Sequence, residues 1–154
     1  MKKLSVCVLV LCFSGILHAQ SGNERDQQDI TPTPANVLSW SAELLPKLEQ
    51  LIPKIEKIKP VQQPDIETKE IILEAKKRLL DIRRAGTTLT AAEAKAQDAW
   101  FRKSIKNLQG NCPNGPDGSE CCFSCNGSSS SGGHGWNVMW CFANCFVFRF
   151  PGLD

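Results

Sequence analysis

Leucine and isoleucine recur at the spacing of a helix face between residues 37 and 58. The intervals are four, three, four and three residues, which brings the side chains onto one face of an α-helix. The residues of this stripe are Leu44, Leu48, Leu51, Ile55 and Ile58. We therefore expect an amphipathic helix from about Val37 to Ile58, with its stripe facing a core.

A short repeat in the same segment complicates this helix. PKLEQLI at 46–52 is followed by PKIEKIK at 53–59 and then by Pro60. A proline inside a helix removes a backbone hydrogen bond and costs about 3 kcal/mol. Because the three prolines fall near one side, their kinks add in one direction. The sequence predicts a curved or broken helix with the apolar stripe on its inner side.

A second segment with helical periodicity extends from about Asp65 to Ala85, and Gly86 is placed to end it. Its stripe consists of Ile72, Ala75, Leu79 and Ile82. Acidic residues precede basic ones by four positions along it, which predicts surface ion pairs. The two pairs are Asp65 with Lys69 and Glu74 with Arg78.

The third segment, from Thr90 to Gly110, has the clearest start signal. Thr90 followed by Glu93 is the pattern of a capping box, in which each side chain accepts a hydrogen bond from the other residue's backbone N–H. The apolar face of this segment consists of Ala94, Phe101, Ile105 and Leu108. The chain is therefore predicted to be mainly α, a small unit of two to three amphipathic helices followed by a short disulfide-rich C-terminal module.

The first 19 residues have the organisation of a secretory signal. Lys2 and Lys3 precede an apolar stretch over 4–17, and Ala19 is a small residue before the polar Gln20. The stretch is shorter than the roughly 20 apolar residues that span a bilayer. We expect cleavage between Ala19 and Gln20 and a secreted, extracellular protein. Residues 20–36 are polar and aperiodic, and are expected to form a disordered leader.

The cysteine content agrees with export. Two of the eight cysteines, Cys7 and Cys12, leave with the signal, and an even number remains. We expect the others to form disulfides of roughly 2–4 kcal/mol each, in a pairing that their spacing does not select. They are Cys112, Cys121, Cys122, Cys125, Cys141 and Cys145. Residues 111–154 are thus the predicted cysteine-rich module, which follows a helical region over 37–110.

Two pairs of these cysteines are separated by three residues, Cys121 with Cys125 and Cys141 with Cys145. Their spacing resembles that of the alpha-hairpinins, in which paired CxxxC segments lie on two antiparallel helices. The resemblance covers about 25 residues. It implies that the two pairs face each other, and it has no place for Cys112 and Cys122.

Aromatic residues also gather near the C-terminus. Phe146, Phe148 and Phe150 alternate with other residues, which predicts a strand with the three rings on one face. This face either packs onto the disulfides and helices or forms an exposed patch that binds a partner or lipid. Together with Trp136 and Trp140, the three phenylalanines are the candidate binding surface.

The residues carry no pattern of catalytic chemistry. Basic and acidic residues are nearly balanced, 18 against 16, so we expect no binding to nucleic acid. The chain contains no Walker loop, dinucleotide fingerprint or nucleophile elbow. Cys125, His134 and Cys141 have the side chains that bind zinc but lack the spacing of paired CxxC knuckles. We expect no catalytic residue, cofactor or metal.

Two kinds of short motif suggest processing of an exported chain. Asn126-Gly-Ser is an acceptor for N-linked glycosylation. Arg83–Arg84 and Arg102–Lys103 are dibasic strings, and cleavage after Lys103 would release residues 104–154 with all the late cysteines. The alternative is that these basic residues form a solvated helix face.

Two functions fit this organisation. The first is a secreted, disulfide-stapled, non-enzymatic effector, toxin-like or host-defence-like, that binds an extracellular receptor, channel or membrane. Its helical region would be a propeptide. The alternative is an intact extracellular binding or matrix protein, in which the helices and the cysteine-rich segment stay together. A hydrolase is the least supported, because no catalytic constellation is present.

Overall fold

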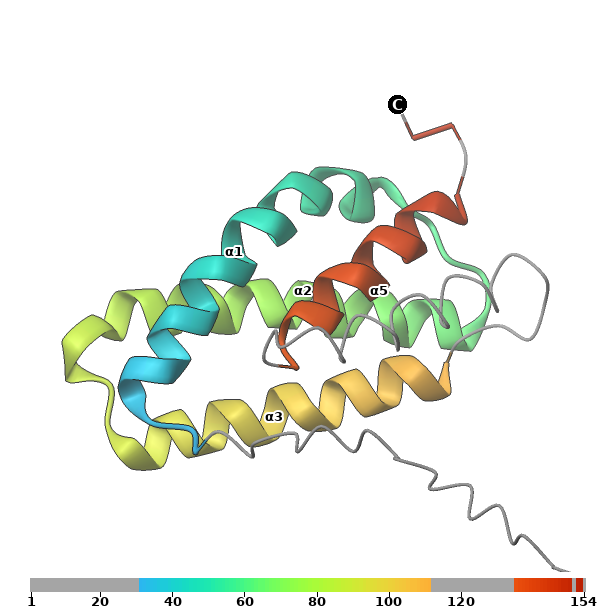
Figure 1. The fold of residues 1–154 in the computed structure, drawn as a ribbon. Coiled ribbons are helices and arrows are strands. Elements are labelled where there is room, and N and C mark those ends of the chain that lie inside the picture. Colours follow the sequence, from blue (N-terminus) through green and yellow to red (C-terminus); the bar gives the residue numbers. More distant parts are fainter. Residues whose placement is uncertain (1–30, 112–134, 151, 154) are drawn as a thin grey trace, which may run out of the picture.

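Four α-helices and one 3₁₀ turn make up the part of the chain that the structure describes. The computed structural model describes residues 31–111, 135–150, 152 and 153. The elements are α1 (Pro34–Lys57), α2 (Gln63–Ala85), η1 (Gly86–Thr88), α3 (Ala91–Gly110) and α5 (Asn137–Phe148). Figure 1 shows α2 and α3 running in opposite directions, with α1 and α5 alongside each other and crossing α2. The prediction of a mainly α fold is confirmed for these residues.

Helix α1 begins earlier than its apolar stripe. Thr33 is the N-cap, and its hydroxyl accepts a hydrogen bond of 3.2 Å from the backbone N–H of Asn36. Pro34 occupies the first helical position, where a missing N–H costs nothing because the first turn has no partner for it. Residues 34–36 are therefore helical, and the predicted leader over 20–36 was too long at this end.

The prolines bend α1 without breaking it. Pro46 and Pro53 lie inside the helix with exposed side chains, and Pro60 follows its end. Figure 1 shows the axis of α1 changing direction along its length. Ala42 and Glu49, the residues four positions before Pro46 and Pro53, are exposed, so the carbonyls that lose a helical partner belong to the solvent-facing side of the helix. Within the predicted stripe Leu51 is only partly buried, and its neighbour Ile52 takes the core position.

The predicted faces of α2 and α3 are largely buried in the same core as α1. The fully buried residues of the two predicted stripes are Ile72, Ala75, Leu79, Ile82, Ala94, Phe101 and Leu108, and Ile105 is partly buried. Between the helices Gly86 adopts a φ of +51°, a conformation that glycine adopts without strain. The capping box is present as predicted, with Thr90 and Glu93 each accepting from the other's backbone N–H.

One predicted ion pair forms and the other does not. Arg78 Nε lies 3.0 Å from Glu74 Oε1, as expected for an i,i+4 pair. Asp65 instead pairs with Arg149, whose Nη2 lies 2.8 Å from Asp65 Oδ1. Lys69 Nζ donates to the backbone carbonyls of Glu56 and Ile58, at 3.0 and 2.6 Å. Asp65 and Lys69 thus contact other parts of the chain, and the spacing of residues within α2 could not predict these contacts.

The predicted strand near the C-terminus is wrong, because these residues form helix α5. The helix buries Val138, Met139, Phe142, Ala143 and Phe146 against the other helices. Phenylalanines at 142, 146 and 150 also recur every four residues, and the rings of Phe146 and Phe150 meet edge to face at 5.2 Å. The aromatic residues of this segment therefore fit a helical period as well as the alternation of a strand. In the described part of the chain no helix is both long and apolar enough to cross a membrane.

Trp136 joins α5 to two other helices. Its ring is 1% exposed, stacks on Phe101 of α3 at 3.9 Å between centroids, and meets Trp40 of α1 edge to face at 5.4 Å. Its indole Nε1 donates a hydrogen bond of 3.2 Å to Oδ1 of the buried Asp98. The second oxygen of Asp98 accepts from Arg102 Nε at 2.7 Å. The start of α5 is therefore fixed by both stacking and hydrogen bonding.

We expect the substitution Trp136→Phe to lower the free energy of unfolding by about 1–3 kcal/mol, because it removes a donor from a buried carboxylate. Urea unfolding followed by circular dichroism measures the change. The matched control is Trp100→Phe at a partly exposed ring, which should change the free energy by less than about 1 kcal/mol. Equal effects of the two substitutions would contradict a special role for the Trp136 indole.

The capping box predicts a dependence of stability on pH. Hydrogen bonds from the backbone N–H and the hydroxyl of Thr90 hold the pKa of Glu93 below its usual value of 4.5. The folded chain thus favours the carboxylate, and this stabilisation is present above pH 4.5 and is lost as the pH falls through the lowered pKa. Glu93→Gln should lose less stability than the parent in this acidic range. Thermal unfolding as a function of pH measures it, with Glu49→Gln on exposed α1 surface as the control.

Candidate functional site

The five aromatic residues of the predicted binding surface do not share one exposed surface. Trp136 and Phe146 are buried in the core, and Trp140 and Phe150 are partly buried. Phe148 alone among them is exposed, with 76% of its surface accessible. Packing, rather than recognition, accounts for most of these rings.

The cysteines are described in part. Cys141 and Cys145 lie one turn apart on α5, are partly buried and are disulfide-bonded. Cys112, Cys121, Cys122 and Cys125 lie outside the described residues, so the pairing stays a prediction. The second CxxxC segment of the alpha-hairpinin resemblance is therefore helical, while the first lies outside what is described.

The dibasic strings lie within helices. Arg83 and Arg84 are exposed in the last turn of α2, where Arg84 Nη1 lies 3.1 Å from Asp81 Oδ1. Arg102 and Lys103 lie within α3. Proteases bind extended backbone, so cleavage at either string requires local unfolding of its helix. The predicted signal cleavage at Ala19 and Gln20 and the glycosylation acceptor Asn126 lie outside the described residues.

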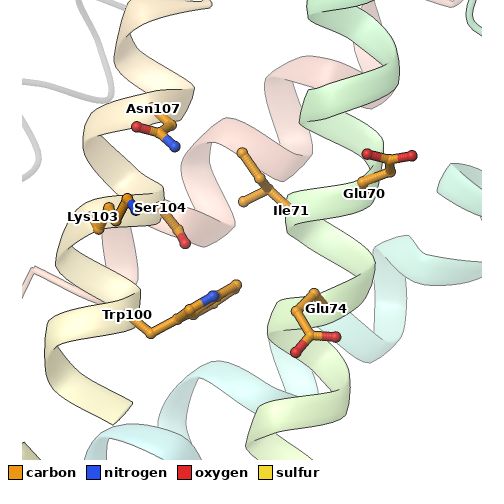
Figure 2. Close-up of a pocket in the computed structure, with 7 residues that line it drawn as sticks. All are labelled: Glu70, Ile71, Glu74, Trp100, Lys103, Ser104 and Asn107. Atoms are coloured by element: carbon orange, nitrogen blue, oxygen red, sulfur yellow. The ribbon is translucent and has the colours of Figure 1, made fainter. Parts of the chain in front are cut away.

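A cleft between α2 and α3 was not expected from the sequence. Figure 2 shows Ile71 of α2 and Trp100 of α3 projecting into the space between the two helices, with the hydroxyl of Ser104 directed into it. The cleft has a volume of about 310 Å³. The complete lining consists of Glu70, Ile71, Glu74, Trp100, Lys103, Ser104 and Asn107. The lining thus combines the apolar Ile71 and Trp100 with the charged Glu70, Glu74 and Lys103.

Arg78 does not line the cleft but contacts one of its lining residues, Trp100. Its guanidinium carbon lies 4.4 Å from the centre of the Trp100 ring, which is a cation–π contact between α2 and α3. Nη1 donates to Gln97 Oε1 at 3.3 Å, and Nε lies 3.0 Å from Glu74 Oε1 in an ion pair without the geometry of a hydrogen bond. The indole of Trp100 is thus fixed by a cation on α2 while its edge stays partly exposed.

The lining of the cleft combines apolar side chains with polar and charged ones. The described residues include no histidine, and among them no three His, Cys, Asp or Glu side chains gather as metal ligands. Ser104 therefore has no described imidazole to act as its base. A volume near the lower limit of small-molecule sites, about 300 Å³, suits a single apolar side chain or a small amphipathic molecule.

Sequence reasoning missed the cleft because Trp100 lies beside the apolar stripe of α3 rather than in it. The available signal was a tryptophan next to the stripe residue Phe101, together with an arginine in the neighbouring helix. Their pairing depends on how α2 and α3 are aligned, which helical periodicity does not determine.

We expect Arg78→Lys to lower the free energy of unfolding by about 1 kcal/mol, because lysine lacks the planar group that stacks on Trp100 and reaches Gln97. Urea unfolding measures the change, and tryptophan fluorescence should shift with it. Arg83→Lys, at an exposed position of the same helix, should stay within about 0.5 kcal/mol of the parent. A parent-like Arg78→Lys would mean that the contact contributes nothing.

Comparison with known proteins gives no relative from which a function can be transferred. No family model matches the chain, and no similar protein was found among curated sequences or solved structures. The function must therefore be argued from the geometry of this chain.

Proposed function

We propose that this chain is an exported, disulfide-stabilised, non-enzymatic binding protein that acts intact. The observation that carries the proposal is the burial of Trp136 between α1 and α3, with its hydrogen bond to Asp98. Through this residue the segment that bears Cys141 and Cys145 belongs to the same core as the helices before it. The proposal takes the alternative of an intact binding protein over a released effector peptide.

The burial of α5 supports this choice. A peptide released after Lys103 would lose α1, α2 and most of α3, and with them the surfaces against which α5 packs. Phe142 and Phe146 would then be exposed to water, at a cost of about 1.5–3 kcal/mol for each side chain that was fully buried. Disulfides stabilise a small module but do not cover such an apolar face.

Export is the part of the proposal that rests on sequence alone. The signal-like residues 1–19 and the even number of late cysteines support it. Binding is supported by the cleft, whose lining combines apolar side chains with charged ones. An effector released by proteolysis remains the competing function, and the dibasic strings are what favours it.

Mass spectrometry of the protein from the medium of producing cells tests the proposal. We expect one chain that begins at Gln20 and still contains residues 104–154 joined to α1–α3. Native limited proteolysis with trypsin should leave Arg102–Lys103 resistant, because the site is helical, whereas Trp136→Phe should accelerate cleavage there by loosening the core.

The matched control is the parent chain unfolded in urea, in which trypsin should cut the same site rapidly. A secreted peptide that begins at Ser104 would overturn the proposal in favour of the released effector. Retention of the chain inside the cells would contradict export.

A further inference from the structure

Two hydrophobic side chains at one end of the molecule are largely exposed to solvent. Val61, in the connection between α1 and α2, is 92% exposed, and Phe148, the last residue of α5, is 76% exposed. Leu80 is the third large exposed hydrophobic residue of the described part, at 37%. Val61 and Phe148 are thus the apolar groups most available to a partner.

An ion pair brings these two residues to the same end of the molecule. Arg149, which follows Phe148, lies 2.8 Å from Asp65 in the first turn of α2. Asp65 follows Val61 by about one helical turn. Figure 1 shows the end of α5 beside the connection between α1 and α2.

Exposed lysines lie at the same end of the molecule as Val61 and Phe148. Lys47 of α1 donates to Oδ1 of Asn137, the first residue of α5, at 3.3 Å. Figure 1 shows α1 and α5 running in the same direction from there, so that their C-terminal ends lie at the same end of the molecule. Ile58 is the C-cap of α1, and Phe148 is the last residue of α5. Lys57 and Lys59, on either side of Ile58, are exposed.

The charge at this end is positive. Lys54, Lys57 and Lys59 stand against the exposed Glu56, and the carboxylate of Asp65 is already paired with Arg149. Glu67 keeps its negative charge, because the amides of Gln63 and Asn111 that donate to it are neutral. Among these described residues, three lysines therefore stand against the two carboxylates of Glu56 and Glu67. We call the group of Lys57, Lys59, Val61 and Phe148 the α5 tip.

We propose that the α5 tip docks the protein on an anionic lipid surface, with Phe148 and Val61 inserted among the headgroups and the lysines against the lipid phosphates. Lysine attracts anionic lipid at about 1 kcal/mol per residue near the surface, while inserted apolar groups add the contact that charge alone does not give. A polyanionic sugar chain would engage the lysines but not the two apolar side chains. The inference rests on the proposed function, because only the intact chain brings α1 and α5 together at this tip.

Co-sedimentation with vesicles tests the inference, using the chain as exported and purified with its disulfides intact. The vesicles are phosphatidylcholine alone, or phosphatidylcholine with about 30% phosphatidylglycerol. We expect binding to the anionic vesicles that weakens in 0.5 M salt, and little binding to the neutral ones. Phe148→Ser should weaken the partition coefficient about tenfold, and the double variant Lys57→Gln, Lys59→Gln should weaken it about thirtyfold.

Matched controls separate the tip from exposed groups elsewhere. Leu80→Ser removes an exposed hydrophobic residue of α2, and the double variant Lys77→Gln, Lys95→Gln removes the same charge from α2 and α3. Both should bind like the parent. Circular dichroism should show unchanged folding for Phe148→Ser, because the side chain is exposed.

Three results would overturn the inference. They are parent-like binding by Phe148→Ser, equal losses in the tip and control variants, and retention on heparin resin that depends on the lysines alone with no binding to vesicles. Fragment analysis of the secreted material decides the proposed function separately, because vesicle binding is measured on the intact chain whether or not cells also cleave it.

Discussion

The buried carboxylate of Asp98 is the constraint from which the rest of the arrangement follows. A carboxylate removed from water must be satisfied by donors, and here Trp136 and Arg102 supply them at 3.2 and 2.7 Å. Trp136 can reach Asp98 only if the start of α5 lies over α3. In that position its ring fills the space between Phe101 and Trp40, so one polar contact fixes the places of three helices.

The position of α5 links its cysteines to its exposed end. Its buried face extends from Val138 to Phe146, and this face holds the turn that carries Cys141 and Cys145 against α1 and α2. The helix then continues just beyond the core, and Phe148 at its end is 76% exposed. Arg149 anchors this end on Asp65, which keeps the exposed ring in a defined place.

Local features of the fold could be predicted from the sequence, and features that depend on distant partners could not. The stripes of α2 and α3 and the capping box at Thr90 are set by neighbours within a turn, so periodicity and spacing found them. Phe146, Phe148 and Phe150 misled the prediction because alternation and helical spacing overlap in so short a segment. Asp65 pairs with Arg149 rather than with the predicted Lys69, and Trp100 lines a cleft. Neither contact could be predicted, because each depends on the alignment of separate helices.

Several contacts between the helices of this protein join residues that are far apart in the sequence. Lys47 meets Asn137 and Asp65 meets Arg149 across separations of 90 and 84 residues. The tryptophan that fills the space between Trp40 and Phe101 is therefore synthesised well after both of its ring partners. Until α5 has been synthesised, α1 lacks part of the surface that covers its apolar side, so the packing of α1 is completed only when this late helix docks.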